Sequence, residues 1–163
     1  MKRIVLKPGM LFGVPLRDQG YIPGIVTHKG KYSGFAAFGQ TLMPVDCSTE
    51  MIERAIACAP WFRAYIAGIG FTRHHWKLFA RNVQIPSPLV RLPLFRVCSD
   101  EPPTMYLGGL DFYPVFVEEP SDGEEVLNYV GYGYAALMQT LEEFAAVPKD
   151  EVEEWKRREG IIS

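Results

Sequence analysis

Short apolar runs separated by turns open the chain, and they constrain its fold more than any other feature. The runs lie at residues 3–6, 10–16, 21–28 and 32–40. Runs of about 4–8 residues rich in aromatic and β-branched side chains, separated by glycine-containing turns such as Arg17–Gly20, are typical of antiparallel strands. Because proline cannot donate to a strand ladder, Pro15 and Pro23 predict edge positions, bulges or strand ends. We therefore expect a strongly curved antiparallel meander, half of a small barrel.

The middle of the chain predicts a mixture of elements. Ser48 or Thr49 can cap a helix that Pro60 would end. Residues 61–71 fit either a strand or irregular structure, whereas 74–85 predict a strand. Two short strands are expected at 105–107 and 112–117.

The end of the chain changes from strand to helix patterns. Apolar residues recur at helical spacing between Tyr134 and Phe144, and a last charged helix is expected at 150–159. With 163 residues, of which 48% are hydrophobic, one domain is expected. The prediction is an α+β fold: a curved antiparallel sheet or partly open small barrel, with helices mainly in the C-terminal part. Residues 1–163 would form this single domain, β-rich over 1–118 and with amphipathic helices at about 133–159.

Cysteines and apolar stretches predict where such a chain resides. Cys47, Cys58 and Cys98 are odd in number and lack CxxC spacing, which favours free buried thiols in a reducing compartment. The N-terminal apolar stretch is shorter than the roughly 7–15 residues of a secretory signal. Pro60, Arg63 and Gly68 interrupt the longest nearly uncharged stretch, so no membrane span is expected. We predict a soluble cytoplasmic protein with no membrane partner.

Charge is divided unevenly between the two parts of the chain. Residues 1–99 carry 13 bases and 4 acids, whereas residues 100–163 carry 4 bases and 15 acids. Such asymmetry suggests a charged partner, because a face of one sign steers encounter. The alternative is that acidic helices lie across a basic sheet and the two neutralise each other.

Residues that could carry catalysis do not assemble into a recognisable motif. Adjacent strand residues such as His74 and His75 point to opposite faces, and with His28 distant they predict no zinc site. Gly131–Gly133 lacks the GxGxxG spacing of a nucleotide loop. We expect no enzyme activity, no cofactor and no metal.

Two basic, aromatic stretches suggest a nucleic-acid alternative. They comprise Tyr32, Phe35 and Phe38 near Lys29 and Lys31, and Trp76 near Arg73, His74, Lys77 and Arg81. A small barrel with stacking rings on a basic face can hold single strands. Strand aromatics are nevertheless first of all core material, so core packing is the favoured interpretation and nucleic acid the less favoured partner.

Two N-terminal stretches and a later one resemble the immunity protein 26 family of bacterial polymorphic toxin systems. They are Lys7–Leu16, Gly20–Val26 and Trp76–Val83, followed by Pro86–Leu94. The resemblance covers about the first hundred residues. It implies a small bacterial protein that acts as a stable scaffold with a complementary surface, and it carries no catalytic residues with it.

The resemblance and the acidic C-terminal part together predict a function. A toxin that attacks nucleic acid has a basic cleft, which an acidic patch can occupy in place of phosphates. We expect the protein to neutralise a cognate toxin by occluding its active surface. The predicted partner-binding residues are Glu118, Glu119, Asp122, Glu124 and Glu125. The alternatives are the nucleic-acid-binding module and a small-molecule-binding domain, the latter if His74 or His75 lies in a deep pocket beside a carboxylate.

Overall fold

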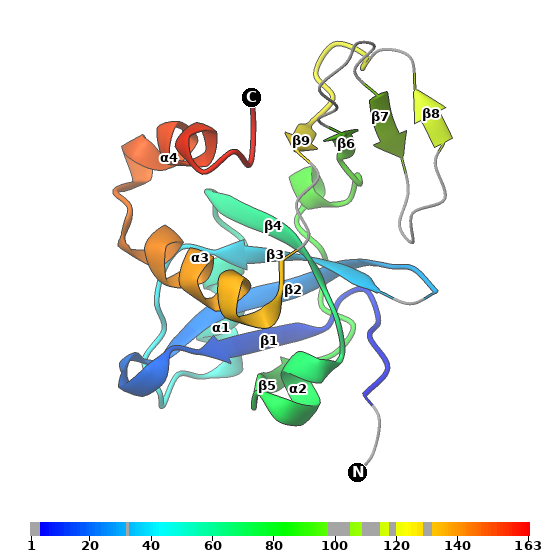
Figure 1. The fold of residues 1–163 in the computed structure, drawn as a ribbon. Helices are drawn as coiled ribbons and strands as arrows, with labels where there is room; N and C mark the ends of the chain where they lie inside the picture. The colour runs from blue at the N-terminus through cyan, green and yellow to red at the C-terminus, as the bar shows by residue number, and fades with distance from the viewer. Residues whose placement is uncertain (1–3, 32, 98–104, 109–114, 118–119, 129–131) are drawn as a thin grey trace.

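The computed structural model of the chain describes residues 4–31, 33–97, 105–108, 115–117, 120–128 and 132–163 (Figure 1). Its strands are β1 (Leu11–Pro15), β2 (Tyr21–Lys29), β3 (Gly34–Gly39), β4 (Trp61–Ile66), β5 (Lys77–Ala80), β6 (Leu94–Val97), β7 (Met105–Gly108), β8 (Val115–Val117) and β9 (Val126–Asn128). Its α-helices are α1 (Thr49–Ile56), α2 (Ile69–Arg73), α3 (Tyr134–Ala146) and α4 (Val152–Arg158). Short 3-10 helices are η1 (Arg17–Gln19), η2 (Ser87–Leu89) and η3 (Lys149–Glu151).

The main sheet has the strand order β4-β3-β2-β1-β5, and every neighbouring pair is antiparallel. In the part of the chain that the structure describes, its edge strands β4 and β5 do not pair with each other, so the sheet stays open. The prediction of an α+β fold with a curved antiparallel sheet and mainly C-terminal helices is confirmed.

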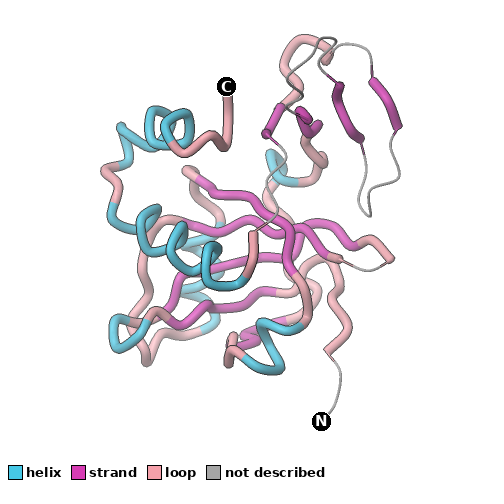
Figure 2. Tube along the Cα trace, in the orientation of Figure 1, coloured by secondary structure: helices cyan, strands magenta, loops and turns pink. Residues whose placement is uncertain are grey.

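Both faces of the main sheet are covered, as Figure 2 shows by the helices on either side of the strands. On one face, Leu11 and Ile25 pack with Ile52 of α1. On the other face, Phe12 belongs to a larger cluster that includes Phe144 of α3. Every residue of β3 is buried as a result. This double burial explains why the strands have continuous apolar runs rather than a clean alternation.

Two prolines were predicted at edges, bulges or strand ends. Pro15 is the last residue of β1. Pro23 instead lies inside β2, a central strand, where it is opposite Gly13. The register that joins β2 to β3 begins only at Gly24, so Pro23 occupies a position where that ladder has ended.

Gly24 is required by a close approach within the core. A Cβ atom at this position would lie 2.5 Å from the ring of Phe12. Glycine therefore lets the Phe12 ring lie flat against β2, where it also stacks on Trp76 with 5.3 Å between ring centroids.

A second sheet has the order β8-β7-β6-β9, with β6 and β9 parallel. Strands were expected at 105–107 and 112–117, where β7 and β8 lie, but their assembly into a separate sheet with β6 and β9 was not. This second sheet joins the main sheet through Phe95 on β6. The Phe95 ring lies 5.6 Å from that of Phe35 and 5.1 Å from that of Tyr65. One hydrophobic cluster therefore continues from the main sheet into the second.

Three predictions of local structure need correction. The run at 3–6 forms no strand in its described part, because Leu6 turns inward and packs over Gly34. The expected strand at 74–85 is reduced to β5, since His75 and Asn82 have left-handed backbones (φ 59° and 60°) that a strand cannot include. Residues 61–71 divide into β4 and α2.

Membrane-spanning helices were not expected. In the described part of the chain, no helix combines the length and apolar content that crossing a bilayer requires.

Candidate functional site

A buried arginine on β4, Arg63, joins the main sheet to the segments that carry the predicted acidic patch. Its Nη1 donates to Oε2 of Glu125 at 2.5 Å. Its Nη2 donates to the carbonyl oxygens of Leu89 at 3.3 Å and Arg91 at 3.1 Å. Burial lowers the pKa of Arg63, and the Glu125 carboxylate opposes this shift by favouring the charged form. The Arg63 guanidinium thus holds two segments against β4. One is the end of η2 with the residues that follow it, and the other is Glu125, just before β9.

The predicted acidic patch is divided by this arrangement. Glu118 and Glu119 lie outside the described residues. Glu125 is bound to Arg63, while Glu124 pairs with Arg91 at 3.3 Å and accepts the Ser121 backbone N–H at 2.7 Å. Asp122 is exposed at the turn. Of the three described carboxylates, two are therefore committed to bonds within the chain and Asp122 faces solvent.

A second acidic surface follows the end of α3, η3 and the start of α4. We call residues 142–154 the acidic helical segment. It contains six acids and one base. The acids are Glu142, Glu143, Asp150, Glu151, Glu153 and Glu154, of which Glu143 is half-buried and the others exposed. Phe144 and Val152 are buried and hold the segment against the core.

Helix electrostatics explain only part of this surface. Glu153 and Glu154 lie in the first turn of α4, where the helix dipole favours negative charge. Glu143 lies in the last turn of α3, where the dipole opposes negative charge. Glu143 accepts a hydrogen bond from Nε2 of Gln139, one turn earlier in α3, at 3.1 Å, and this bond partly offsets its unfavourable position. Both acidic runs are visible in the sequence, but the run at 118–125 is the denser one and therefore attracts the prediction.

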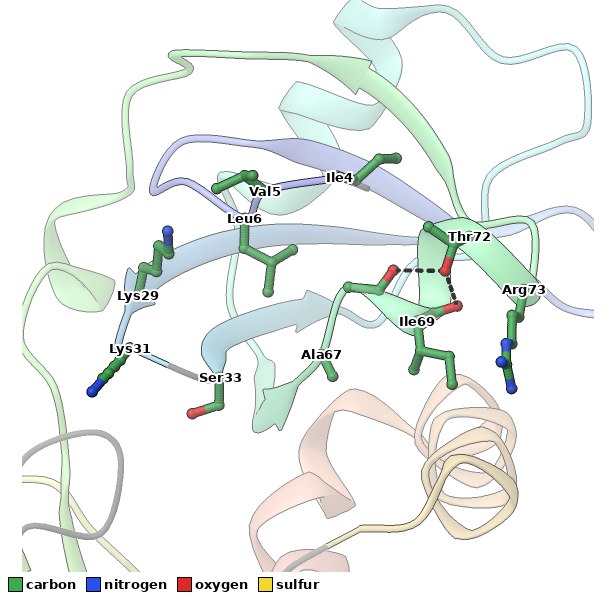
Figure 3. A pocket seen from close by; sticks show the side chains of 11 residues that line it. Ile4, Val5, Leu6, Lys29, Lys31, Ser33, Ala67, Ile69, Thr72 and Arg73 are labelled. Carbon is green, nitrogen blue, oxygen red and sulfur yellow. Dashed lines mark hydrogen bonds between the residues drawn. The ribbon is translucent and has the colours of Figure 1, made fainter. Parts of the chain in front are cut away.

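A groove lined in part by cations opens where β2 ends, beside α2 (Figure 3). Its volume is about 630 Å³. Lys29 and Lys31, from the end of β2 and the following turn, lie on one side, and Arg73 of α2 lies on the other. Leu6 and Ile69 lie between them. The residues of this groove come from three separate segments, so no local pattern in the sequence indicates it.

The two adjacent histidines lie in different surroundings. His74 ends α2 and its ring stacks on Tyr134, with 3.3 Å between centroids, while His75 is exposed. They are not strand residues on opposite faces, as predicted, but loop residues. Among the described residues, no cluster of histidine, cysteine and carboxylate ligands could hold a metal ion.

The cysteines differ from each other in burial. Cys47 is buried in the cluster beneath α1, and burial raises the pKa of its thiol. Cys58 is exposed, so the prediction that it is buried is wrong. The physical reason is its place beyond the last buried residue of α1, Ile56, in the turn that leads to β4. Cys98 lies outside the described residues.

The aromatic rings proposed for base stacking are used by the core. Phe35, Phe38 and Trp76 are all buried, and each contacts other aromatic rings. Tyr32 lies outside the described residues. The three described rings therefore offer no exposed face to a nucleic-acid base.

His28 connects the main sheet to the segment that follows η2. Its Nε2 lies 2.8 Å from the Val90 carbonyl oxygen, which can only accept, so Nε2 carries a proton. Burial is the main cause that lowers the pKa of His28; the bond to Val90 raises it, and the nearby charge of Arg63 lowers it further. His28 and Arg63 therefore hold the same segment from two strands.

Comparison with known proteins yields no match: no protein-family profile, no curated protein and no solved structure is significantly similar to this chain.

Proposed function

We propose that this chain is an immunity-type binding protein that neutralises a cognate bacterial toxin by occluding its active surface. The proposal starts from the resemblance to the immunity protein 26 family. The stretches that carry it fall on β1, β2 and β5, which are neighbours in the main sheet. Residues more than sixty positions apart in the sequence thus belong to one packed unit, as the stacking of Phe12 on Trp76 illustrates.

The residues of those stretches build a scaffold and leave binding to other surfaces. Gly24 and Phe12 are buried in the core, so they have no exposed atoms to offer a partner. A protein that acts by occlusion needs a rigid framework together with a complementary surface. The separation of scaffold residues in the core from charged residues on the surface supports a binding role.

The acidic helical segment is the observation that carries the proposal. Its exposed carboxylates lie on a rigid helical layer anchored by Phe144 and Val152. Carboxylates spaced along such a surface can replace the phosphates that a basic nuclease-type cleft would bind. Asp122 extends the acidic character beyond this segment, whereas Glu125 acts in the fold.

Co-expression with a toxin encoded beside the gene in its native genome tests the proposal. The protein should restore growth and form a complex whose association slows as salt is added. Replacing Glu142, Glu151 and Glu154 by lysine should lower the association rate about tenfold or more at low salt. The matched control replaces Asp46, Glu50 and Glu53, three exposed acids in and just before α1, by lysine, and it should leave the rate nearly unchanged. No growth rescue, or equal loss in both variants, would contradict the proposal.

A further inference from the structure

A second pocket lies between η1, in the turn that joins β1 to β2, and the end of α3; we call it the α3 pocket. Its volume is about 330 Å³, at the lower end of the range of ligand sites, so it suits one inserted side chain better than a whole cofactor. Three of its lining residues, Glu142, Ala145 and Ala146, belong to the acidic helical segment. The pocket is therefore continuous with the surface proposed to bind the toxin.

Hydrogen bonds fix both walls of the α3 pocket. In the turn, the Leu16 N–H donates to the Gly20 carbonyl oxygen at 2.9 Å, and the Gln19 N–H donates to the Leu16 carbonyl oxygen at 2.8 Å. At the end of α3, the buried side chain of Gln40 donates to the Phe144 carbonyl oxygen at 3.0 Å. Binding to walls that are already fixed costs less, because few groups have to be ordered.

Arg17, in the turn wall, has a backbone conformation that arginine rarely adopts. Its φ angle is 30°, in the left-handed region that favours glycine. Such strain persists only where the surrounding structure fixes it, and it is concentrated at functional sites. The strained backbone of Arg17 thus supports a role for this wall beyond closing the turn.

The lining of the α3 pocket changes from apolar to polar with exposure. Leu16 is buried and Leu42 and Ala145 are half-buried, so these apolar side chains form the floor. The exposed polar side chains at the edge are those of Arg17, Gln19 and Glu142.

This lining selects a neutral aromatic side chain. Arg17 and Glu142 contribute one charge of each sign, so a cationic or an anionic guest would be repelled by one of them. A tyrosine or tryptophan side chain combines a large apolar ring with a neutral polar group, which matches an apolar floor and a polar edge. Both residue types are also enriched among the side chains that contribute most to binding at protein interfaces.

We propose that the α3 pocket receives a tyrosine or tryptophan side chain of the toxin, which anchors the complex beside the acidic helical segment. This inference rests on the proposed function, because one partner contacts both. Charges act at a distance and set the association rate, whereas an inserted ring acts only on contact and sets mainly the dissociation rate. The two parts of the surface can therefore be separated by kinetics.

Titration of the full, isotope-labelled chain with N-acetyl-tryptophanamide tests the pocket without the toxin. We expect NMR shifts at the backbone amides that line the pocket, with a Kd on the order of 10 mM. The corresponding leucine and arginine derivatives should bind at least about threefold more weakly. Ala146→Phe places a ring of the chain itself at the pocket and should abolish the shifts. Ala136→Phe, at an exposed position of α3 outside the pocket lining, is the matched control and should retain them.

Binding kinetics with the toxin encoded beside the gene test the partner. Ala146→Phe should raise the dissociation rate about tenfold or more and leave the association rate within about twofold. Ala136→Phe should change neither rate. Leu42→Ala removes part of the floor and should raise the dissociation rate at least about threefold. Circular dichroism shows whether each variant is folded.

The outcomes separate this inference from the proposed function. If the parent chain does not bind the toxin, both are rejected. If the parent chain binds but Ala146→Phe and Ala136→Phe dissociate equally fast, the anchor is rejected and the proposed function stands. Absence of shifts at about 20 mM N-acetyl-tryptophanamide, or tighter binding of the arginine derivative to the pocket, would also overturn the inference.

Discussion

Replacing Glu125 by glutamine should destabilise the protein although nearly half of the Glu125 side chain is exposed. The reason is its partner, because the Arg63 side chain is only 3% exposed whereas that of Glu125 is 44% exposed. Glutamine keeps the size of glutamate and can still accept a hydrogen bond, but it removes the compensating charge. Arg63 would then remain buried with the carbonyls of Leu89 and Arg91 as its other acceptors.

The expected magnitude follows from the burial of the two groups. A hydrogen bond to a charged group contributes about 1.5–3 kcal/mol, and losing the compensating charge of a fully buried pair costs about 3–5 kcal/mol. Because water reaches Glu125, the lower range applies, and we expect a loss of about 2 kcal/mol. For a chain of this length that corresponds to a decrease in Tm of roughly 4–8 °C.

Urea unfolding at pH 7, followed by tryptophan fluorescence, measures this loss. Asp122→Asn removes the same charge from a neighbouring exposed position and should change the free energy of unfolding by less than about 0.5 kcal/mol. Arg63→Met should be more destabilising than Glu125→Gln, because it leaves two backbone carbonyls without their donor. Adding Glu125→Gln to Arg63→Met should then change little, since the carboxylate has already lost its partner. Equal stability of Glu125→Gln and Asp122→Asn would refute the reasoning and return Glu125 to the binding surface.

Two further predictions concern pH and backbone geometry. The pKa of His28 is lowered in the fold, so as pH falls the unfolded chain binds this proton before the folded chain does, and stability should decrease as pH falls below about 6.5 towards the folded pKa. Urea midpoints measured between pH 5 and 8 should decrease less for His28→Gln than for the parent chain. Equal dependence of the two midpoints on pH would contradict this. Gly20→Ala should cost about 3 kcal/mol or more, because Gly20 has φ 113° and its added Cβ would collide with the Met43 carbonyl oxygen. Gly160→Ala, with φ 70° and open space, should cost only about 1 kcal/mol in the same unfolding assay, and similar losses would show that the collision relaxes freely.

The hairpin of β1 and β2 was predictable because its signals are local. Turn residues, apolar run length and the composition of Arg17–Gly20 all act within a few positions, and the structure places the hairpin there. The helices α3 and α4 were predictable for the same reason, from spacing within one segment. The second sheet was not, since β6 pairs with β9 about thirty residues later and each strand has only three or four residues.

The candidate sites show the same limit. The acidic character of the C-terminal part is visible in composition, but which carboxylates remain available depends on partners such as Arg63, 62 residues before Glu125. The groove depends on bringing Lys29 and Arg73 together across the sheet, and no spacing rule encodes that meeting. Long-range packing, and not local preference, thus decides which charges are free to bind.

Helices and the second sheet cover both faces of the main sheet. Substitutions in the buried sheet and in the outer helices therefore have very different consequences. A change on β3 meets packed atoms on either side, and cores tolerate little change of volume. Exposed positions such as Glu142 and Glu151 can be exchanged at almost no cost to folding. If a binding partner changes under selection, the sequence of the outer helices can therefore diversify while that of the interior stays fixed.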